Sequence, residues 1–218
     1  MLLRFLSLLI FLPVFAYSQT SIELRYGMNR AIWRIDDRIL EDNTYTLDRI
    51  ICGIGVDIPI TKMFSIKPEI GYVQKGNRYI QQDTSSKENF IDKMNYIELP
   101  VQLKFNLHYE QFTFYLSAGP NFSYAINGTN YYSRLTKTDY YQQEVKINFS
   151  DDIFRKAEVG ILLGTGVSLP IWKLRLGVDV RYSNSLTNLL DENSQYPFKA
   201  FNKGIQLCGL VGIPLSWD

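Results

Sequence analysis

Charged side chains recur at alternate positions along several segments of this chain, and they are the first residues that could carry chemistry. The set contains as many carboxylates as cations, which would suit a proton or solute pathway or an enzyme site. It would equally suit ion pairs that fill an interior, because buried charges must be paired. The residues are Lys67, Glu69, Glu98, Lys104, Glu158, Arg175, Asp179 and Arg181.

Five tyrosines gather in two long polar stretches and form a second candidate site. Tyr79 lies in the first stretch, and Tyr131, Tyr132, Tyr140 and Tyr141 lie in the second. Exposed tyrosine is favoured at binding surfaces, where its ring can stack on sugars or peptides. Alternatively, the second stretch packs on itself, or its apolar residues at 145, 147 and 149 extend a hairpin. The pattern leaves these alternatives open.

Residues for the common catalytic and metal sites are scarce. His108 is the single histidine, and its turn holds no nucleophile, so we expect no Ser-His-Asp or multi-histidine zinc chemistry. Cys52 and Cys208 fall on opposite faces of non-adjacent segments, so we expect no disulfide. No phosphate-binding glycine loop occurs. The residues therefore predict neither an enzyme, nor a bound cofactor, nor a metal site.

The overall composition narrows the possible partners. The chain has 23 basic and 22 acidic residues, whereas nucleic-acid-binding proteins usually carry a basic excess. Aromatic residues make up 14% of the 218 residues, which argues against disorder.

Eight segments position these residues, and each alternates apolar and polar side chains. Strict alternation is the signal of a half-buried strand. After residue 19 no stretch approaches the roughly 20 apolar residues of a spanning helix. The eight segments are 22–26, 52–58, 64–72, 97–105, 112–124, 159–167, 174–182 and 205–215.

Short and long connections between these segments alternate strictly along the chain. The short ones are 59–63, 106–110 and 170–172; the long, polar ones are 28–48, 75–93, 126–153 and 184–202. Membrane barrels have short periplasmic turns and long outer loops. The pattern predicts an all-β fold, an eight-stranded antiparallel up-and-down transmembrane β-barrel. Because side chains fill a barrel of this size, we expect the charged set to be a structural network that plugs the lumen.

The side chains of the two strand faces favour a membrane barrel over a soluble secreted one, which alternation alone allows. Glycines and balanced charges on the polar face suit a narrow lumen. Aromatic residues at strand ends on the apolar face suit the girdles at the two membrane interfaces. These residues are Phe64, Tyr72, Phe105, Phe112, Tyr124, Tyr182 and Trp217.

The first nineteen residues have the organisation of a secretory signal. Arg4 precedes an apolar run from Phe5 to Phe15, and small residues follow at Ala16 and Ser18. We expect residues 1–19 to be removed and residues 20–218 to form the outer-membrane barrel domain.

Several motifs give the chain a family resemblance. The strand at 96–105, YIELPVQLKF, resembles the Y-I-E-L-P strand of PorT-like outer-membrane β-barrels of Bacteroidetes-type bacteria, and Gly119-Pro120 also matches. Further matching segments are 160–166, 181–188 and 201–204. The resemblance implies an eight-stranded barrel, in most members without an assigned activity. One member serves a protein secretion apparatus.

Three prolines fall inside expected strands, where a missing N–H interrupts the ladder. These prolines are Pro68, Pro100 and Pro120, and bulges are the usual solution. Because Pro100 and Pro120 also belong to the matching motifs, we expect β-bulges at these two positions.

Together these observations predict an outer-membrane protein that acts as a structural or interaction module. Its long extracellular loops would engage a partner, including an envelope or secretion-system protein, while its barrel contacts outer-membrane lipid as a monomer. The alternatives are a lipid-modifying enzyme, a small porin and a soluble secreted ligand-binding barrel.

Overall fold

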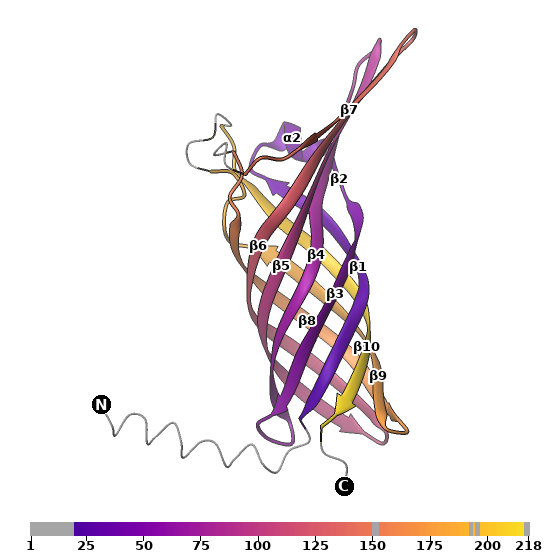
Figure 1. The fold of residues 1–218 in the computed structure, drawn as a ribbon, viewed down its shortest axis with the longest axis vertical. Coiled ribbons are helices and arrows are strands. Elements are labelled where there is room, and N and C mark those ends of the chain that lie inside the picture. The colour runs from indigo at the N-terminus through magenta and orange to yellow at the C-terminus, as the bar shows by residue number, and fades with distance from the viewer. Residues whose placement is uncertain (1–19, 150–152, 192–193, 195–196, 216–218) are drawn as a thin grey trace, which may run out of the picture.

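The computed structural model describes residues 20–149, 153–191, 194 and 197–215. Over these residues the chain forms a long, narrow β-barrel from which one side of the wall continues upward (Figure 1). The predicted signal at 1–19 and the girdle residue Trp217 lie outside the described residues.

Eight strands close the barrel, and each is antiparallel to its neighbours. Each pairs with the next along the chain, and the last pairs with the first, from Ser21↔Pro214 to Ile35↔Ala200. The up-and-down barrel predicted from alternation is therefore confirmed. The strands of the ring are β1 (Ser21–Ile35), β3 (Leu47–Pro59), β4 (Phe64–Gln82), β5 (Ser86–Tyr109), β6 (Phe112–Thr136), β8 (Ala157–Ile171), β9 (Leu174–Ser185) and β10 (Ala200–Pro214).

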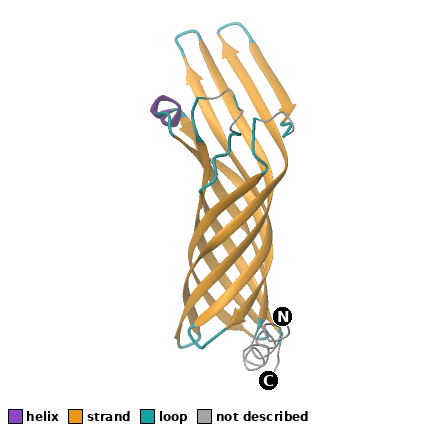
Figure 2. Ribbon diagram, turned by 90° about the vertical axis from the view of Figure 1, so that its left-hand side faces the viewer, coloured by secondary structure: helices purple, strands orange, loops and turns teal. Residues whose placement is uncertain are grey.

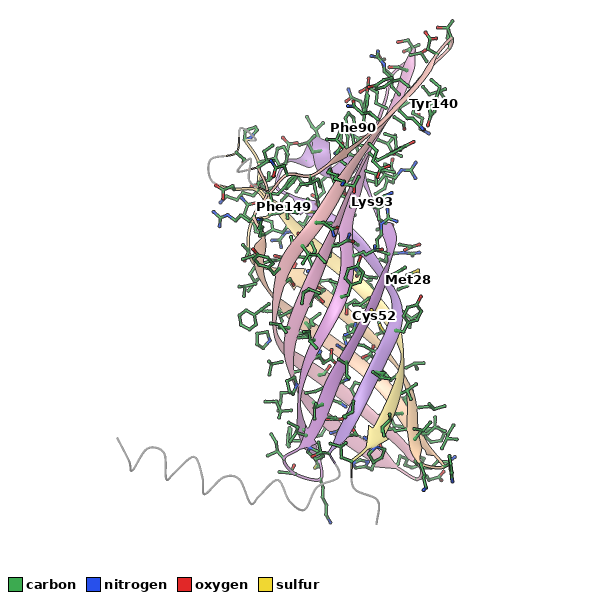
Figure 3. All side chains as sticks on the ribbon, in the orientation of Figure 1. Met28, Cys52, Phe90, Lys93, Tyr140 and Phe149 are labelled. Atoms are coloured by element: carbon green, nitrogen blue, oxygen red, sulfur yellow. The ribbon has the colours of Figure 1, made fainter. Side chains whose placement is uncertain are left out.

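Polar and apolar side chains of the barrel wall are arranged in the reverse of a soluble protein. The polar ones face the interior and the apolar ones face outward. In β1 the charged Glu23 and Arg25 are buried inside, whereas Leu24 and Tyr26 are exposed outside. Met28 also lies on the outside of the wall (Figure 3). An apolar outer face and a polar interior are what a lipid environment requires.

Near the outer end of the apolar surface, seven of the eight strands carry an outward-facing polar side chain, and we call these residues the outer polar belt. Tyr72 and Tyr182 lie one outward-facing position before this belt on β4 and β9, as expected of an interfacial girdle. Phe64 and Phe105 pack against each other at the opposite end of the barrel, with their rings tilted and the ring centroids 5.3 Å apart. The belt consists of Arg30, Asp48, Gln74, Asn95, Asn127, Asn184 and Lys203.

Beyond the belt, β4, β5 and β6 continue as a sheet that β7 (Tyr140–Lys146) completes; we call this the outer sheet (Figure 2). The expectation of long loops over 75–93 and much of 126–153 was therefore wrong. Strands that meet water on both faces also carry polar side chains. The polar composition of these two stretches therefore did not show where the strands end. The hairpin alternative for the second stretch is confirmed, since β7 pairs with β6 from Thr129↔Lys146 to Leu135↔Tyr140.

The connection after β1 holds the short helix α2 (Arg38–Asp42) and the strand β2 (Thr44–Tyr45), which pairs with β4. Asp37 caps the helix by accepting hydrogen bonds from the backbone N–H groups of Ile39 and Leu40. Among the described residues, no helix is both long and apolar enough to cross a membrane.

None of the three prolines lies at a register shift, so the bulges predicted at Pro100 and Pro120 were wrong. Pro68 pairs with Val101, Pro100 with Asn121 and Pro120 with Ile161, all in continuous register. Each proline's strand also pairs with a second neighbour, and that ladder lacks two residue pairs at the proline. The gap arises because proline has no N–H to donate. The register shift in the β5–β6 ladder lies instead between Asn95 and Tyr96, near the outer polar belt.

Candidate functional site

Eight charged side chains fill the middle and lower lumen; we call them the lower lumen cluster. Glu69 is its centre, because its two carboxylate oxygens receive both terminal nitrogens of Arg181 at 2.7 and 2.9 Å. Arg25 and Lys67 reach the same carboxylate at 3.1 and 2.8 Å. The full cluster is Glu23, Arg25, Asp57, Lys67, Glu69, Lys104, Asp179 and Arg181.

Carboxylates and cations of the lower lumen cluster are equal in number. Lys67 Nζ lies 2.5 Å from Glu23, Lys104 Nζ lies 2.5 Å from Asp57, and Arg181 lies 2.7 Å from Asp179. All of these side chains are buried. Since each cation has a carboxylate partner, the cluster meets the condition under which charge is tolerated in an interior.

A smaller cluster, the upper lumen cluster, lies nearer the outer end. Lys75 Nζ lies 2.8 Å from both Glu98 and Glu158. Asn202 donates to Glu158 at 2.6 Å, and Asn121 donates to Glu98 at 2.8 Å. Glu98 belongs to the segment that carries the family resemblance, so that strand motif supplies part of the lumen network.

Seven of the eight predicted network residues are buried in these two clusters, whereas Arg175 is half-buried. Among described residues Arg175 forms no ion pair within 4.0 Å. The prediction missed Glu23, Arg25, Asp57 and Lys75. The first three occupy polar positions of predicted strands. Lys75 follows Lys67 and Glu69 at even spacing, so extending that strand by three residues would have found it.

Aromatic rings form a row on one face of the outer sheet, here called the aromatic row. It runs from Tyr79 to Phe90 to Tyr132 to Tyr141, with successive ring centroids 6.0, 4.8 and 6.1 Å apart. One residue comes from each of β4, β5, β6 and β7, because the strand register places them nearly opposite one another. Phe90 lies lower on the outer sheet than Tyr140, which is near the tip (Figure 3).

The predicted tyrosine group is therefore split between two faces. Tyr79, Tyr132 and Tyr141 belong to the aromatic row. Tyr131 and Tyr140 lie on the opposite face, where their hydroxyl oxygens are 3.2 Å apart and each donates to Gln142 at 3.0 Å. Phe90, the missing member of the row, was recognisable from the sequence only after its strand had been extended past the belt.

Histidine and cysteine, which often serve in catalysis, are few in this chain, and the one histidine is held by structural contacts. The ring nitrogens of His108 lie 3.0 Å from Thr113 Oγ1 and 3.1 Å from the Lys62 carbonyl, at the turn end of the barrel. Cys52 and Cys208 are free thiols. Within the described ranges, no group of three or more His, Cys, Asp and Glu side chains could hold a metal ion.

A family model described as outer membrane protein beta-barrel domain matches residues 16–191. The chain belongs to this family. A search of curated proteins found no match. The protein is therefore a bacterial outer-membrane β-barrel, and this decides between the membrane and soluble alternatives.

One likeness among the solved structures supports the same fold. Neisserial surface protein A is 11% identical and has a TM-score of 0.50, over 91% of this chain and 98% of its own. OprG from Pseudomonas aeruginosa is 9% identical with a TM-score of 0.46, over 89% and 95%. Ail, the attachment invasion locus protein of Yersinia pestis, is 10% identical with a TM-score of 0.39, over 88% and 99%. At these identities the first likeness supports the fold alone.

Proposed function

We propose that this outer-membrane barrel anchors the outer sheet at the cell surface and presents it to a partner protein. The observation that carries the proposal is the outer sheet itself, which continues past the apolar surface and bears the aromatic row. In outer-membrane barrels the long connections face outward, so we infer that this sheet lies outside the cell.

Two features of the outer sheet suit protein binding. Tyr140 and Tyr141 are 60% and 52% exposed, and tyrosine is enriched where proteins bind one another. In the described part of the chain, β7 pairs with β6 alone, so its other edge offers unpaired N–H and C=O groups to an incoming strand. Every residue of β7 is exposed.

The lumen supports a role that is neither transport nor catalysis. Buried ion pairs cross it at two levels, and the lumen of an eight-stranded barrel is narrow enough for side chains to fill it. We therefore propose a monomeric, non-enzymatic barrel whose function lies in its outer surface. If PorT-like membership holds, an envelope or secretion-system protein is the first partner to test.

Co-purification from native membranes tests this proposal. We expect a partner to co-purify with the wild-type protein and to be lost when Tyr140 and Tyr141 are both replaced by serine. Trp172→Ser is the matched control, because Trp172 is 89% exposed in the turn at the opposite end of the barrel. A partner lost equally with both variants, or with neither, would contradict binding through the outer sheet.

A further inference from the structure

A cavity of about 730 Å³ lies at the outer mouth of the barrel, above the upper lumen cluster. Its wall includes Asn77, which follows Lys75 by two residues on the same face of β4. Trp33 of β1 and Phe154 and Leu190 from the connections also line it. Small-molecule sites commonly measure about 300–1,000 Å³, so this cavity has the size of a ligand site.

A polar row crosses the cavity wall from strand to strand. Asn77 is paired with Asp92, and Asp92 with Asn130, in the register of β4, β5 and β6. Asn130 Nδ2 donates to Asp92 Oδ1 at 2.7 Å. The aromatic residues Tyr79 and Phe90 form the next row outward on the same face and also line the cavity.

Two lining side chains carry buried polar atoms that lack partners among the described residues. Asn77 is 2% exposed, and its Oδ1 accepts no hydrogen bond. Trp33 is 7% exposed, and its Nε1–H donates none. Buried polar atoms are nearly always paired, and each unpaired one costs free energy that a bound molecule could recover. Here one acceptor and one donor are unpaired.

The unpaired atoms and the rest of the lining restrict the kind of ligand that the cavity would bind. Most of the lining is aromatic or aliphatic, including Trp33, Phe154 and Ile35, so the body of a ligand must be apolar. A hydroxyl group both donates and accepts, which matches Asn77 Oδ1 and Trp33 Nε1–H together. The lining holds one carboxylate, Asp92, and one ammonium group, Lys146, so it favours neither a cation nor an anion and suits an uncharged molecule.

We propose that this mouth cavity binds an uncharged, mainly apolar molecule that carries a hydroxyl group, of the class of aromatic alcohols. The site is separate from the exposed tip residues Tyr140 and Tyr141, and it requires no partner protein.

Calorimetric titration of the protein in lipid nanodiscs tests the proposal, with empty nanodiscs as the blank. The probes are 2-naphthol, which donates and accepts, and 2-methoxynaphthalene, which only accepts. We expect saturable one-to-one binding of both probes, with 2-naphthol favoured about fivefold, the ratio that one neutral hydrogen bond gives. Absence of saturable binding above the blank, or equal affinity for the two probes, would overturn the proposal.

Two variants assign the contacts. Asn77→Leu should remove the preference for 2-naphthol and leave the affinity for 2-methoxynaphthalene unchanged. Trp33→Phe should weaken both probes about fivefold and keep the preference. Asn127→Leu, on the outside of the wall, is the matched control and should change neither.

Folding of each variant is checked by heat-modifiable migration in detergent gels. If Asn77→Leu does not fold, the test rests on Trp33→Phe. Unchanged affinity of Trp33→Phe for both probes would overturn the assignment of the ligand contacts. A preference for 2-naphthol that persists in folded Asn77→Leu would do the same.

Discussion

Lys75 is the single residue on which the upper lumen cluster depends, because both Glu98 and Glu158 lie 2.8 Å from its Nζ. Lys75→Met would leave two buried carboxylates without their cation. We expect a loss of about 3–5 kcal/mol, the usual consequence of breaking a buried ion pair. Urea unfolding in detergent measures it.

Arg30→Met is the control for this prediction. Arg30 pairs with Asp48 at 2.7 Å, but both side chains are about half exposed at the outer polar belt. Solvent screens such a pair, so we expect no measurable change in unfolding. Equal losses for the two variants would contradict the assignment of stability to the lumen clusters.

Asp92, above the membrane-spanning part of β5, should make stability depend on pH. Burial raises the pKa of its carboxyl from the ordinary 3.8 to about 6, although the hydrogen bond from Asn130 opposes the shift. The folded state therefore favours the protonated form. The stabilisation is complete below the unfolded pKa and is lost as pH rises through about 6.

Asp92→Asn should remove this dependence. The measurement is the urea midpoint of wild type and variant at several pH values. We expect the wild type to lose stability relative to Asp92→Asn between about pH 4 and 6, the interval set by the two pKa values. A difference in urea midpoint between wild type and Asp92→Asn that stays constant across this pH interval would show that Asp92 does not titrate there.

At the scale of elements, Gly76 lies where β4 leaves the barrel for the outer sheet. Its φ of 153° is unfavourable for other residues, and a Cβ there would lie 1.9 Å from the carbonyl oxygen of Asp92. Gly76→Ala should therefore destabilise the protein by about 1–3 kcal/mol. The urea midpoint measures the change.

Gly209→Ala is the matched glycine control. A Cβ at Gly209 would have its nearest neighbour 3.9 Å away, which is ordinary contact. We expect unchanged or slightly higher stability. If Gly76→Ala behaves in the same way, the close approach between β4 and β5 does not constrain that position.

The aromatic row should hold the outer sheet together. Tyr132→Ala removes ring contacts to both Phe90 and Tyr141, each worth about 0.5–1.5 kcal/mol. We expect faster amide hydrogen exchange in β7 and no change in β8–β10. Tyr140→Ala, on the opposite face of the sheet, should have a smaller effect on β7.

Alternation located the eight strands because lipid and lumen impose opposite polarity on successive side chains, as at Glu23 and Leu24. Outside the membrane both faces meet water, so the period-two signal fades after Tyr72 and the continuation of β4 could not be predicted. Lys75 and Phe90 were missed for this reason. The prolines were misjudged because a missing N–H affects one ladder only and leaves the register intact.

Pairing of individual charges was also beyond prediction. The polar positions of the strands indicated a filled lumen, but which carboxylate meets which cation depends on strand stagger around the ring. Glu69 of β4 meets Arg181 of β9, which are 112 residues apart and not on neighbouring strands. Only the closed barrel brings them together.

At the scale of the whole molecule, the barrel has a filled interior, and we propose that it serves as an anchor whose function lies at the outer end. The lower lumen cluster has equal numbers of carboxylates and cations, and its members contact one another across the lumen. A passage for ions would require these contacts to open, leaving buried charges unpaired.

Ion conductance of the purified protein in planar lipid bilayers tests this claim most directly. We expect no unitary conductance steps above those of the empty bilayer, at any voltage the membrane withstands. Sustained steps that change in size when Arg181 is replaced by lysine would show that ions pass the lower lumen cluster, and would contradict the account of a filled lumen.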